Sequence, residues 1–302
     1  MQSASNVVAI IVTYNPEQQP LYLLASALAR QCQKVVIVDN SEPPCEFTTL
    51  LARHNQAIQV VPLGANQGIA SAQNIGIKQA FHYPCDAIAL FDQDSVIDDK
   101  YIGNIYQALE CARKSLPFPV AAIGPCYQDD RQTQKSPFVK VSGLCIKRVA
   151  CNGAKVLVEV DCLIASGSLL TVEALKTAGC MQEDLFIDYV DAEWCLRAKS
   201  FGYRCVGACH VSMKHSLGDD PITVFGRKFT LHSPLRHYYL MRNAASLYLR
   251  SNLPIQWKIA DGLRLMCKFI IYGIFGKPRL MHIKMMLRGL YDGLRGRMGR
   301  FV

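Results

Sequence analysis

The sequence predicts an α/β fold in which a mostly parallel sheet is flanked by helices and followed by a helical, basic C-terminal extension. In the first half, continuous apolar, β-branched runs alternate with longer helical stretches. This alternation is typical of parallel strands covered on both faces. Half of the 302 residues are hydrophobic and 19% are charged, so the chain can bury a large core and is not expected to be disordered.

The expected elements follow one another along the chain. Strands are predicted at residues 7–13, 34–39, 58–62 and 86–92, and the helices between them at 21–30, 47–54 and 69–82. The second half is predicted to contain a strand at 156–164, a tight turn at 166–168, a short helix at 172–177, a helix from about 190 to 201 and a strand at 203–211. After Pro221 the pattern is helical to the end of the chain, with interruptions at Pro234, Pro254, Gly276 and Pro278.

Charge divides the chain into two parts. Residues 227–302 contain 15 Lys and Arg against two acids, and subtraction from the totals of 33 and 24 leaves 18 basic and 22 acidic residues in 1–226. Apolar residues are interspersed with the basic ones, which favours binding to an anionic membrane surface over binding to nucleic acid. A solvated helical face is the alternative. The apolar stretch 265–276 has 12 residues, includes Lys268, and is too short to span a bilayer.

The 13 cysteines show no regular spacing, and the N-terminal residues lack the basic segment and cleavage site of a secretory signal. We therefore expect free thiols in a reducing cytoplasm, which excludes a disulfide scaffold. Cys205, Cys209 and His210 lie within one predicted strand, where they are poorly placed for a tetrahedral zinc site.

Four ends of the predicted strands are polar, and ligands of parallel sheets bind at the carboxyl ends of strands. These ends are Thr13-Tyr14-Asn15, Asp39-Asn40-Ser41, Asn66-Gln67-Gly68 and Asp92-Gln93-Asp94. Each could be a helix cap or a turn by itself, but four on one edge favour a common site. The third leads into a helix start that is suited either to an anion or to close packing.

Asp92 and Asp94 are separated by one residue at the end of a strand, so both carboxylates can point at one cation. Mg²⁺ or Mn²⁺ prefers one or two carboxylates together with the oxygens of a diphosphate. Such an ion would neutralise the charge that develops on a nucleoside-diphosphate leaving group.

A second acidic group lies at the start of the helix predicted from about residue 190. Asp188, Asp191 and Glu193 could stabilise the helix dipole, or one of the three could be a general base. The helix extends roughly 17 Å away from Asp191, and the strand that follows is long enough to run back along it over roughly 26 Å. His215, after that strand, would then lie near Asp191 and could reach a metal ion on Asp94.

Together these motifs resemble the inverting glycosyltransferases of family 2, which have the GT-A (Rossmann-like) fold, and among them the rhamnosyltransferases of bacterial surface polysaccharide assembly. The resemblance covers about residues 7–216. It rests on the sequences IIVTYNP at 10–16, VDNS at 38–41, NQGIASAQNIG at 66–76, FDQDS at 91–95 and DYVDAEWCLR at 188–197. The basic C-terminal region is similar more loosely.

The resemblance implies a GT-A catalytic domain at residues 1–226, with a nucleotide-binding half at about 1–125 and an acceptor-binding half at about 126–226. Asp191 would be the catalytic base; Val190 occupies the place of the family's Glu, which leaves Asp188 as an alternative. Asp94 and His215 would hold Mg²⁺ or Mn²⁺. The nucleotide sugar would contact Thr13, Asn15, Asp39, Asn66, Gly68, Asp92 and Gln93, and the acceptor would contact Gly167, Ser168, Asp188 and Trp194.

The implied reaction is the inverting transfer of L-rhamnose from dTDP-L-rhamnose to a polyprenyl-diphosphate-linked saccharide in O-antigen or other surface polysaccharide assembly. The protein would bind the cytoplasmic face of the inner membrane peripherally through residues 227–302. One alternative is a family 2 transferase that uses another UDP- or dTDP-hexose. A nucleotidyltransferase is disfavoured, because Thr13-Tyr14-Asn15-Pro16 stands where such an enzyme has a Gly-rich, basic loop. A non-catalytic, membrane-associated nucleotide-binding module is the remaining alternative.

Overall fold

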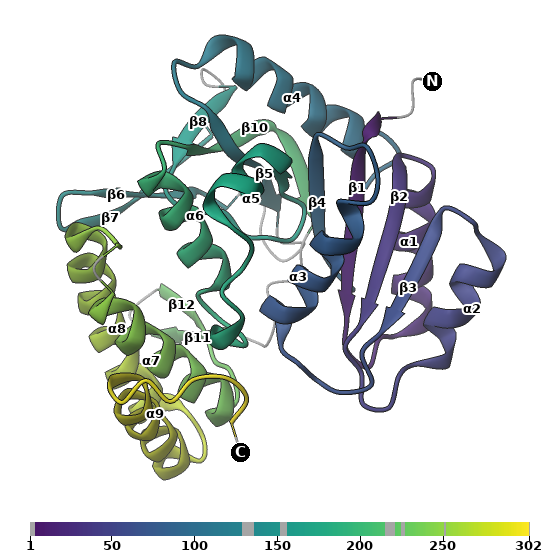
Figure 1. Ribbon diagram of the computed structural model, residues 1–302. Coiled ribbons are helices and arrows are strands. Elements are labelled where there is room, and N and C mark those ends of the chain that lie inside the picture. The colour runs from purple at the N-terminus through teal and green to yellow at the C-terminus, as the bar shows by residue number, and fades with distance from the viewer. Residues whose placement is uncertain are drawn as a thin grey trace.

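The computed structural model describes residues 4–128, 136–151, 156–214, 221–224, 227–250 and 252–301. Its centre is an eight-stranded sheet with the order β3-β2-β1-β4-β9-β5-β10-β8 (Figure 1). Strands β1 (Ala4–Thr13), β2 (Cys32–Asp39), β3 (Ile58–Pro62) and β4 (Ala87–Asp92) are parallel to their neighbours in this group. The predicted parallel half of the sheet is therefore confirmed.

The other half of the sheet is mixed. β5 (Val120–Gln128) pairs in parallel with β10 (Arg204–Lys214). The short strand β9 (Leu169–Thr171) lies antiparallel between β4 and β5, and β8 (Leu157–Val160) is antiparallel to β10 at the edge. The sheet as a whole is mostly parallel, as the sequence predicts.

Both faces of the sheet are covered, which explains why the strand sequences are continuously apolar. Along β1, Ile10 belongs to the core on one face and Ile11 to the core on the other, since successive side chains alternate. Helices α3 (Ile69–Ala80), α5 (Val172–Ala178) and α6 (Val190–Ser200) cover the first face (Figure 1). Helices α1 (Gln18–Ala29) and α4 (Tyr101–Ser115) cover the second, and α2 (Glu46–His54) packs beside β3.

Several elements differ from the expectations. The strand expected at 156–164 ends at Val160, and the hairpin of β6 (Phe138–Ser142) and β7 (Cys145–Val149) precedes it. A second hairpin, of β11 (Pro221–Val224) and β12 (Arg227–Thr230), stands where helix was predicted. The sequences PITV and RKFT contain β-branched and aromatic residues that favour extended backbone, and this local preference overrides the helical pattern assumed there.

The C-terminal region consists of α7 (Pro234–Leu249), α8 (Ile255–Phe275) and α9 (Arg279–Leu294), which lie together beside α6 (Figure 1). α9 packs closely on α7, because a Cβ atom at Gly289 would overlap the carbonyl oxygen of Tyr238 and one at Gly293 would overlap that of Arg242. Among the described residues, no helix combines the length and the hydropathy needed to cross a membrane.

One disulfide corrects the expectation that all thiols are free. Cys151, after β7, is bonded to Cys209 of β10, and the other eleven cysteines are free thiols. The amide of Cys209 donates to the carbonyl of Val156, which shows that the chain entering β8 lies against β10 at this point. The Cα atoms of the two cysteines are 5.3 Å apart, a separation typical of bonded pairs. A single bond does not make the protein a disulfide scaffold.

Candidate functional site

The polar ends of β1, β2 and β4 meet at one edge of the sheet. Thr13 stands opposite Asp39 in the register of β1 and β2, and Val12 stands opposite Asp92 in that of β1 and β4. Gln93 then joins two of these ends: its Oε1 accepts from the amide of Tyr14 at 2.7 Å and its Nε2 donates to the carbonyl of Tyr14 at 3.2 Å.

Asp39 organises the loop that follows β2. The residue is fully buried, and its carboxylate accepts from Thr13 Oγ1 (3.2 Å), the Ser41 amide (3.1 Å), the Cys45 amide (2.7 Å) and Thr48 Oγ1 (3.2 Å). Both oxygens therefore have partners within the protein.

The loops after β1, β2 and β3 are joined by hydrogen bonds of polar side chains. Asn40 Nδ2 donates to Asn66 Oδ1 at 3.1 Å, and Asn40 Oδ1 accepts from the Gln67 amide at 2.7 Å. Ser41 Oγ accepts from the amide of Asn15, which has the left-handed backbone conformation (φ 45°). These bonds connect the predicted nucleotide-binding segments into one surface.

At the start of α3, the structure favours the packing interpretation over an anion site. Gly68 has φ 85°, and a Cβ atom there would overlap Phe186. The Gly68 amide donates to Asn66 Oδ1 at 3.0 Å and the Ile69 amide donates to the carbonyl of Phe186 at 2.8 Å. The amides of Gly68 and Ile69 are thus already used by the chain.

The carboxylates of Asp92 and Asp94 follow β4. Asp92 is half-buried and its amide donates to Ser166 Oγ, which also contacts Ser95 Oγ at 2.7 Å. Asp94 is exposed. Val96 forms a β-bridge with Lys214, the last residue of β10, so the end of that strand lies beside the segment that carries Asp94. His215 itself lies outside the described residues.

The described donors fit a hard divalent cation. No group of three His, Cys, Asp or Glu side chains that could hold a metal ion occurs in the part of the chain that the structure describes. Two carboxylates of one loop, completed by the diphosphate oxygens of a substrate, are nevertheless the ligand set that Mg²⁺ commonly uses. Asp92 and Asp94 supply such a pair.

Asp191 lies in the first turn of α6 and is half-buried. Its Oδ2 accepts from the amide of Ala165 at 3.0 Å, and it borders a small apolar cavity lined by Leu163, Met181 and Trp194, among others. Burial raises the pKa of Asp191 from 3.8 to about 6, and the carboxylates of Asp92 and Asp188 add to the increase. A carboxylate with such a pKa is well suited to accept a proton near neutral pH.

Asp188 differs from Asp191 in both conformation and charge environment. It precedes the helix, with φ 64°, so the two acids do not share a helical face. Its carboxylate forms an ion pair with Arg236 of α7, with 3.3 Å between Oδ1 and Nη2. The geometry therefore favours Asp191 over Asp188 as the base.

Three residues predicted to contact the acceptor make structural contacts within the protein. Gly167, with φ 79°, donates its amide to the Leu90 carbonyl at 2.7 Å and accepts from Tyr101 Oη at 2.6 Å. Ser168 and Trp194 are each 1% exposed; Ser168 Oγ donates to the Ile164 carbonyl and Trp194 Nε1 to the Gly179 carbonyl. Gly167 and Ser168 support the turn from which Ala165 contacts Asp191.

The motifs of the sequence did not reveal several residues that contact the predicted site but lie far from it along the chain. Ser166, from the tight turn, links Asp92 to Ser95. Arg236 and Asn243 of α7 and Asp261 of α8 contact the segment that leads into α6. Asp261 could have been singled out, because it is one of only two acids in residues 227–302.

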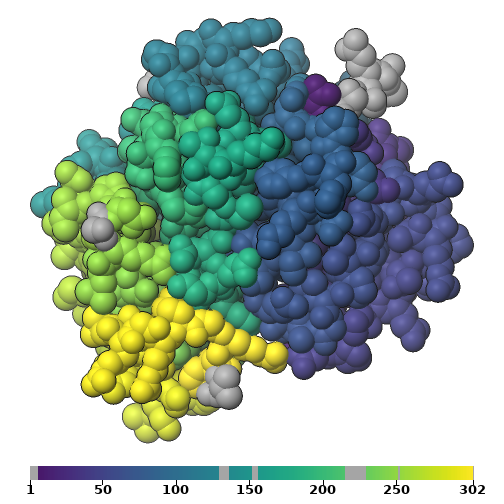
Figure 2. Space-filling view, in the orientation of Figure 1, coloured from purple at the N-terminus to yellow at the C-terminus, as the bar shows by residue number. Residues whose placement is uncertain are grey.

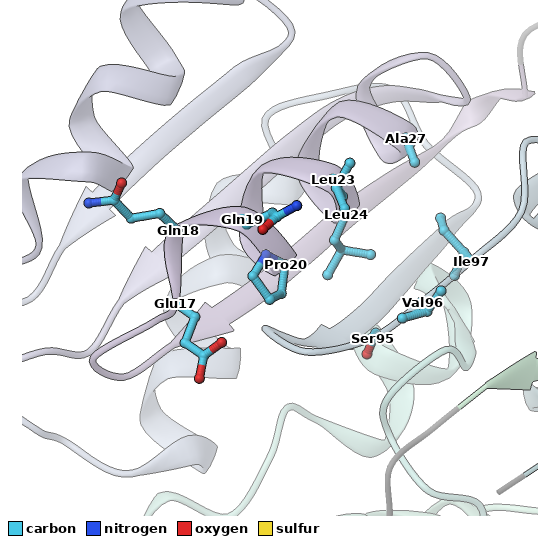
Figure 3. Close-up of a pocket in the computed structure, with 10 residues that line it drawn as sticks. All are labelled: Glu17, Gln18, Gln19, Pro20, Leu23, Leu24, Ala27, Ser95, Val96 and Ile97. Atoms are coloured by element: carbon cyan, nitrogen blue, oxygen red, sulfur yellow. The ribbon is translucent and has the colours of Figure 1, made fainter. Parts of the chain in front are cut away.

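A groove of about 530 Å³ lies at the side of the site, between the start of α1 and the segment after β4 (Figure 3). Its walls include Pro20, Leu23, Val96 and Ile97. None of the predicted site residues lines it, although Ser95 at its edge directly follows Asp94.

Comparisons with known proteins agree with this geometry. Residues 8–150 match the family described as Glycosyl transferase family 2. The chain is 32% identical to the dTDP-rhamnosyl transferase RfbF of Shigella flexneri over 295 residues, which cover 97% of this chain and 96% of that protein.

Two solved structures share the fold at low sequence identity. The structure of S. aureus TarS 1–349 in complex with UDP-GlcNAc is similar with a TM-score of 0.63 and 18% identity, over 96% of this chain and 81% of that one. GalNAc-T7 with UDP, GalNAc and Mn²⁺ is similar with a TM-score of 0.58 and 12% identity, over 98% of this chain and 57% of that one.

Proposed function

Because the chain belongs to glycosyl transferase family 2, we propose that it transfers L-rhamnose from dTDP-L-rhamnose to a hydroxyl group of a lipid-linked saccharide. The observation that carries the choice of donor is the 32% identity to a dTDP-rhamnosyl transferase over nearly the whole of both chains. The geometry supports a transferase, because Asp191, with its raised pKa, lies near the carboxylate of Asp92 at the carboxyl edge of the sheet.

The donor would lie on the surface formed by the joined loops after β1, β2 and β3. Asp39 would shape this surface by holding the loop after β2, since its oxygens already accept four hydrogen bonds. Because Gly68 has no Cβ atom, Phe186 can pack against the start of α3, beside the nucleotide. The full set proposed for the nucleotide sugar is Thr13, Asn15, Asp39, Asn66, Gly68, Asp92 and Gln93.

Asp94 would hold Mg²⁺ or Mn²⁺, with Asp92 beside it and His215 as a further ligand. The structure of GalNAc-T7 with Mn²⁺ and UDP, which has a similar fold, supports the use of a divalent ion. Such an ion would neutralise negative charge on the departing diphosphate.

Asp191 would accept the proton of the attacking acceptor hydroxyl on its carboxylate. The hydroxyl oxygen then forms a bond to the anomeric carbon as the bond from that carbon to the dTDP oxygen breaks. Attack from the face opposite the diphosphate inverts the configuration in one displacement. The bond from the Ala165 amide to Oδ2 would hold the carboxylate in one orientation, which lowers the entropic cost of aligning base and hydroxyl.

The acceptor would be a polyprenyl-diphosphate-linked saccharide of O-antigen or surface polysaccharide assembly, reached at the cytoplasmic face of the inner membrane. The outer face of α8 carries a stripe of exposed apolar side chains spaced by three or four residues: Ile255, Ile259, Leu263, Met266, Ile270 and Ile274. Arg264, Lys277, Arg279 and Lys284 are exposed on or near it. An apolar stripe with basic neighbours fits an anionic membrane surface.

The donor is tested by release of nucleoside diphosphate from purified protein with Mg²⁺ or Mn²⁺ and a lipid-linked acceptor extract. The panel contains dTDP-rhamnose, other dTDP-sugars, UDP-sugars and GDP-sugars. We expect metal-dependent dTDP release from dTDP-rhamnose and loss of release with Asp94→Ala. Turnover of a UDP-hexose instead would overturn the choice of donor while leaving the transferase assignment intact.

Membrane binding is tested by co-sedimentation with vesicles of phosphatidylglycerol or phosphatidylcholine. We expect the wild type to bind the phosphatidylglycerol vesicles, and we expect the double variant Met266→Glu, Ile270→Glu to lose this binding. Leu50→Glu is the matched control, because Leu50 is also exposed but lies on α2. Equal sedimentation of all variants would contradict the proposed surface.

A non-catalytic nucleotide-binding module is the competing function. Such a module would have no use for a carboxylate kept half-buried beside two other acids. Asp191→Asn separates the two functions, since a transferase loses turnover but keeps donor binding, whereas a binding module has no turnover to lose.

A further inference from the structure

The segment that leads into Asp191 has an unusual backbone. Phe186, Asp188 and Tyr189 have φ values of 63°, 64° and 64°, and none of them is glycine. Non-glycine residues in this region are disfavoured and persist only where the surroundings hold them in place. Asp191 follows directly in the first turn of α6, so its position depends on how this segment is held.

Helix α7 holds the segment by its carbonyl groups. Asn243 is fully buried, and its Nδ2 donates to the carbonyls of Leu185 (2.9 Å), Ile187 (2.7 Å) and Asp188 (3.0 Å). Arg242 supports this amide from behind, since its Nε and Nη2 donate to Asn243 Oδ1 at 3.0 and 2.8 Å. The amide is therefore fixed with its NH₂ group towards the segment.

Helix α8 holds the same segment through Asp261, which is 6% exposed. Asp261 Oδ2 accepts from Tyr189 Oη and from Tyr248 Oη, each at 2.6 Å. Short bonds to a buried carboxylate are among the stronger hydrogen bonds in proteins. Tyr189 precedes Asp191 by two residues, whereas Tyr248 belongs to α7.

On its other side the segment contacts the nucleotide-binding half. The Phe186 carbonyl accepts from the Ile69 amide of α3 at 2.8 Å, and the Phe186 ring stacks on Tyr239 of α7 with 5.0 Å between centroids. The C-terminal end of the chain also reaches that half, where Arg300 pairs with Glu42 at 3.1 Å. Figure 2 shows the last residues in yellow extending from the C-terminal helices to the blue N-terminal half.

We propose that Asp261 and Asn243 are positioning residues for the catalytic base, and that α7 and α8 complete the active site in addition to any role at the membrane. This inference rests on the proposed role of Asp191. It predicts that bonds made by residues of the C-terminal helices, far from the reacting atoms, set the rate of transfer. A separate membrane module would leave that rate unchanged.

The closing experiment compares Tyr189→Phe with Tyr248→Phe in the full-length protein. Each variant loses one 2.6 Å hydrogen bond to the same oxygen of Asp261, and both tyrosines are half-buried, so their costs in stability should be similar. Only Tyr189 belongs to the segment that leads into Asp191, whereas Tyr248 belongs to α7. We expect kcat to fall about 10- to 100-fold in Tyr189→Phe and about 3-fold or less in Tyr248→Phe, with KM for the donor changed little in both. Asp261→Asn keeps an acceptor for the tyrosines and should be less impaired than Asp261→Ala.

Two further readouts separate positioning from a general loss of folded enzyme. Release of the segment should expose Asp191 to water, lower its pKa and so move the acidic limb of the kcat–pH profile to lower pH. A smaller fraction of folded enzyme would lower kcat without moving this limb. Hydrogen exchange of the amides in 184–192, measured without substrate, should accelerate in Tyr189→Phe and Asn243→Ala but not in Tyr248→Phe. Equal losses of kcat in the two tyrosine variants, or unchanged exchange in Tyr189→Phe, would overturn the proposal. The exchange result is independent of the donor, so it stands even if rhamnose is not the sugar transferred.

Discussion

Replacement of Asp191 by Asn should stabilise the protein at neutral pH while it removes activity. Folding raises the pKa of this carboxyl group from 3.8 to about 6, so the folded state binds the proton more tightly than the unfolded state does. Stability is therefore lost as pH rises from about 3.8 to about 6, and the ionised group remains unfavourable above that range. Asn removes the ionisation, and its amide oxygen can still accept from the Ala165 amide.

The size of the effect follows from the shift. A pKa shift of about two units corresponds to at most about 3 kcal/mol in the free energy of unfolding. Solvent access to the half-buried side chain reduces this value, so we expect Asp191→Asn to gain about 1–3 kcal/mol. General bases contribute about 10²- to 10⁴-fold to rate, which sets the expected loss of kcat.

The assay is urea unfolding at pH 7.5 and pH 4.5, without divalent metal or donor, because a bound ligand would stabilise the folded state. Asp191→Asn should be more stable than wild type at pH 7.5, and the difference should shrink at pH 4.5. Asp94→Asn is the control and should change stability by less than about 0.5 kcal/mol, since Asp94 is exposed. An Asp191→Asn protein that is no more stable than wild type at pH 7.5 would refute the reasoning.

Four other predictions concern the site and the packing of the helices. The kcat of the wild-type enzyme should fall as pH drops through about 6, because protonated Asp191 cannot accept the hydroxyl proton, and a rate–pH profile that is flat from pH 5 to 8 would contradict this. At the Mg²⁺ concentration that saturates the wild type, Asp94→Ala should lower turnover by about two orders of magnitude, and a metal titration should show partial recovery at higher concentration. Gly293→Ala should destabilise the protein by about 1–3 kcal/mol, because its methyl group would overlap the Arg242 carbonyl. Gly103→Ala, at an exposed position of α4 with open space around it, should stabilise the protein by up to about 1 kcal/mol; both glycine variants are measured by the same urea unfolding assay.

The parallel half of the fold could be predicted because its signals are local. Strands β1, β2 and β4 have central residues that are buried on both faces and apolar, and polar residues follow directly at their carboxyl ends. For the same reason the sequence alone located Asp39, Asp92 and Asp94 at one edge.

The rest depends on contacts between distant segments. β9 has three residues and is defined only by its place between β4 and β5. The positive φ angles of Phe186 and Tyr189 have no signature in residue type, because Asn243 and Asp261, from helices more than 50 residues later, hold this segment in place. The predicted acceptor contacts of Ser168 and Trp194 came from the family resemblance and stay predictions, whereas the burial of both side chains and their bonds to backbone carbonyls could not be predicted from the sequence.

The contacts of Asp261 also change how the C-terminal region should be tested. Deletion of the C-terminal region would remove the Asp261 carboxylate, which accepts a hydrogen bond from Tyr189. It would also remove the exposed apolar stripe of α8. Truncation therefore cannot separate membrane binding from catalysis, and substitutions on the outer face of α8 are the appropriate test.

The central claim is tested most directly by transfer of labelled rhamnose from dTDP-rhamnose to a lipid-linked acceptor, measured for wild type and Asp191→Asn with donor binding determined in parallel. We predict metal-dependent transfer by the wild type, and a loss of at least about 100-fold in Asp191→Asn with unchanged affinity for the donor. Transfer by Asp191→Asn at the wild-type rate would contradict the assignment of the base. An absence of transfer by the wild type, with donor and acceptor both bound, would contradict the proposed reaction itself.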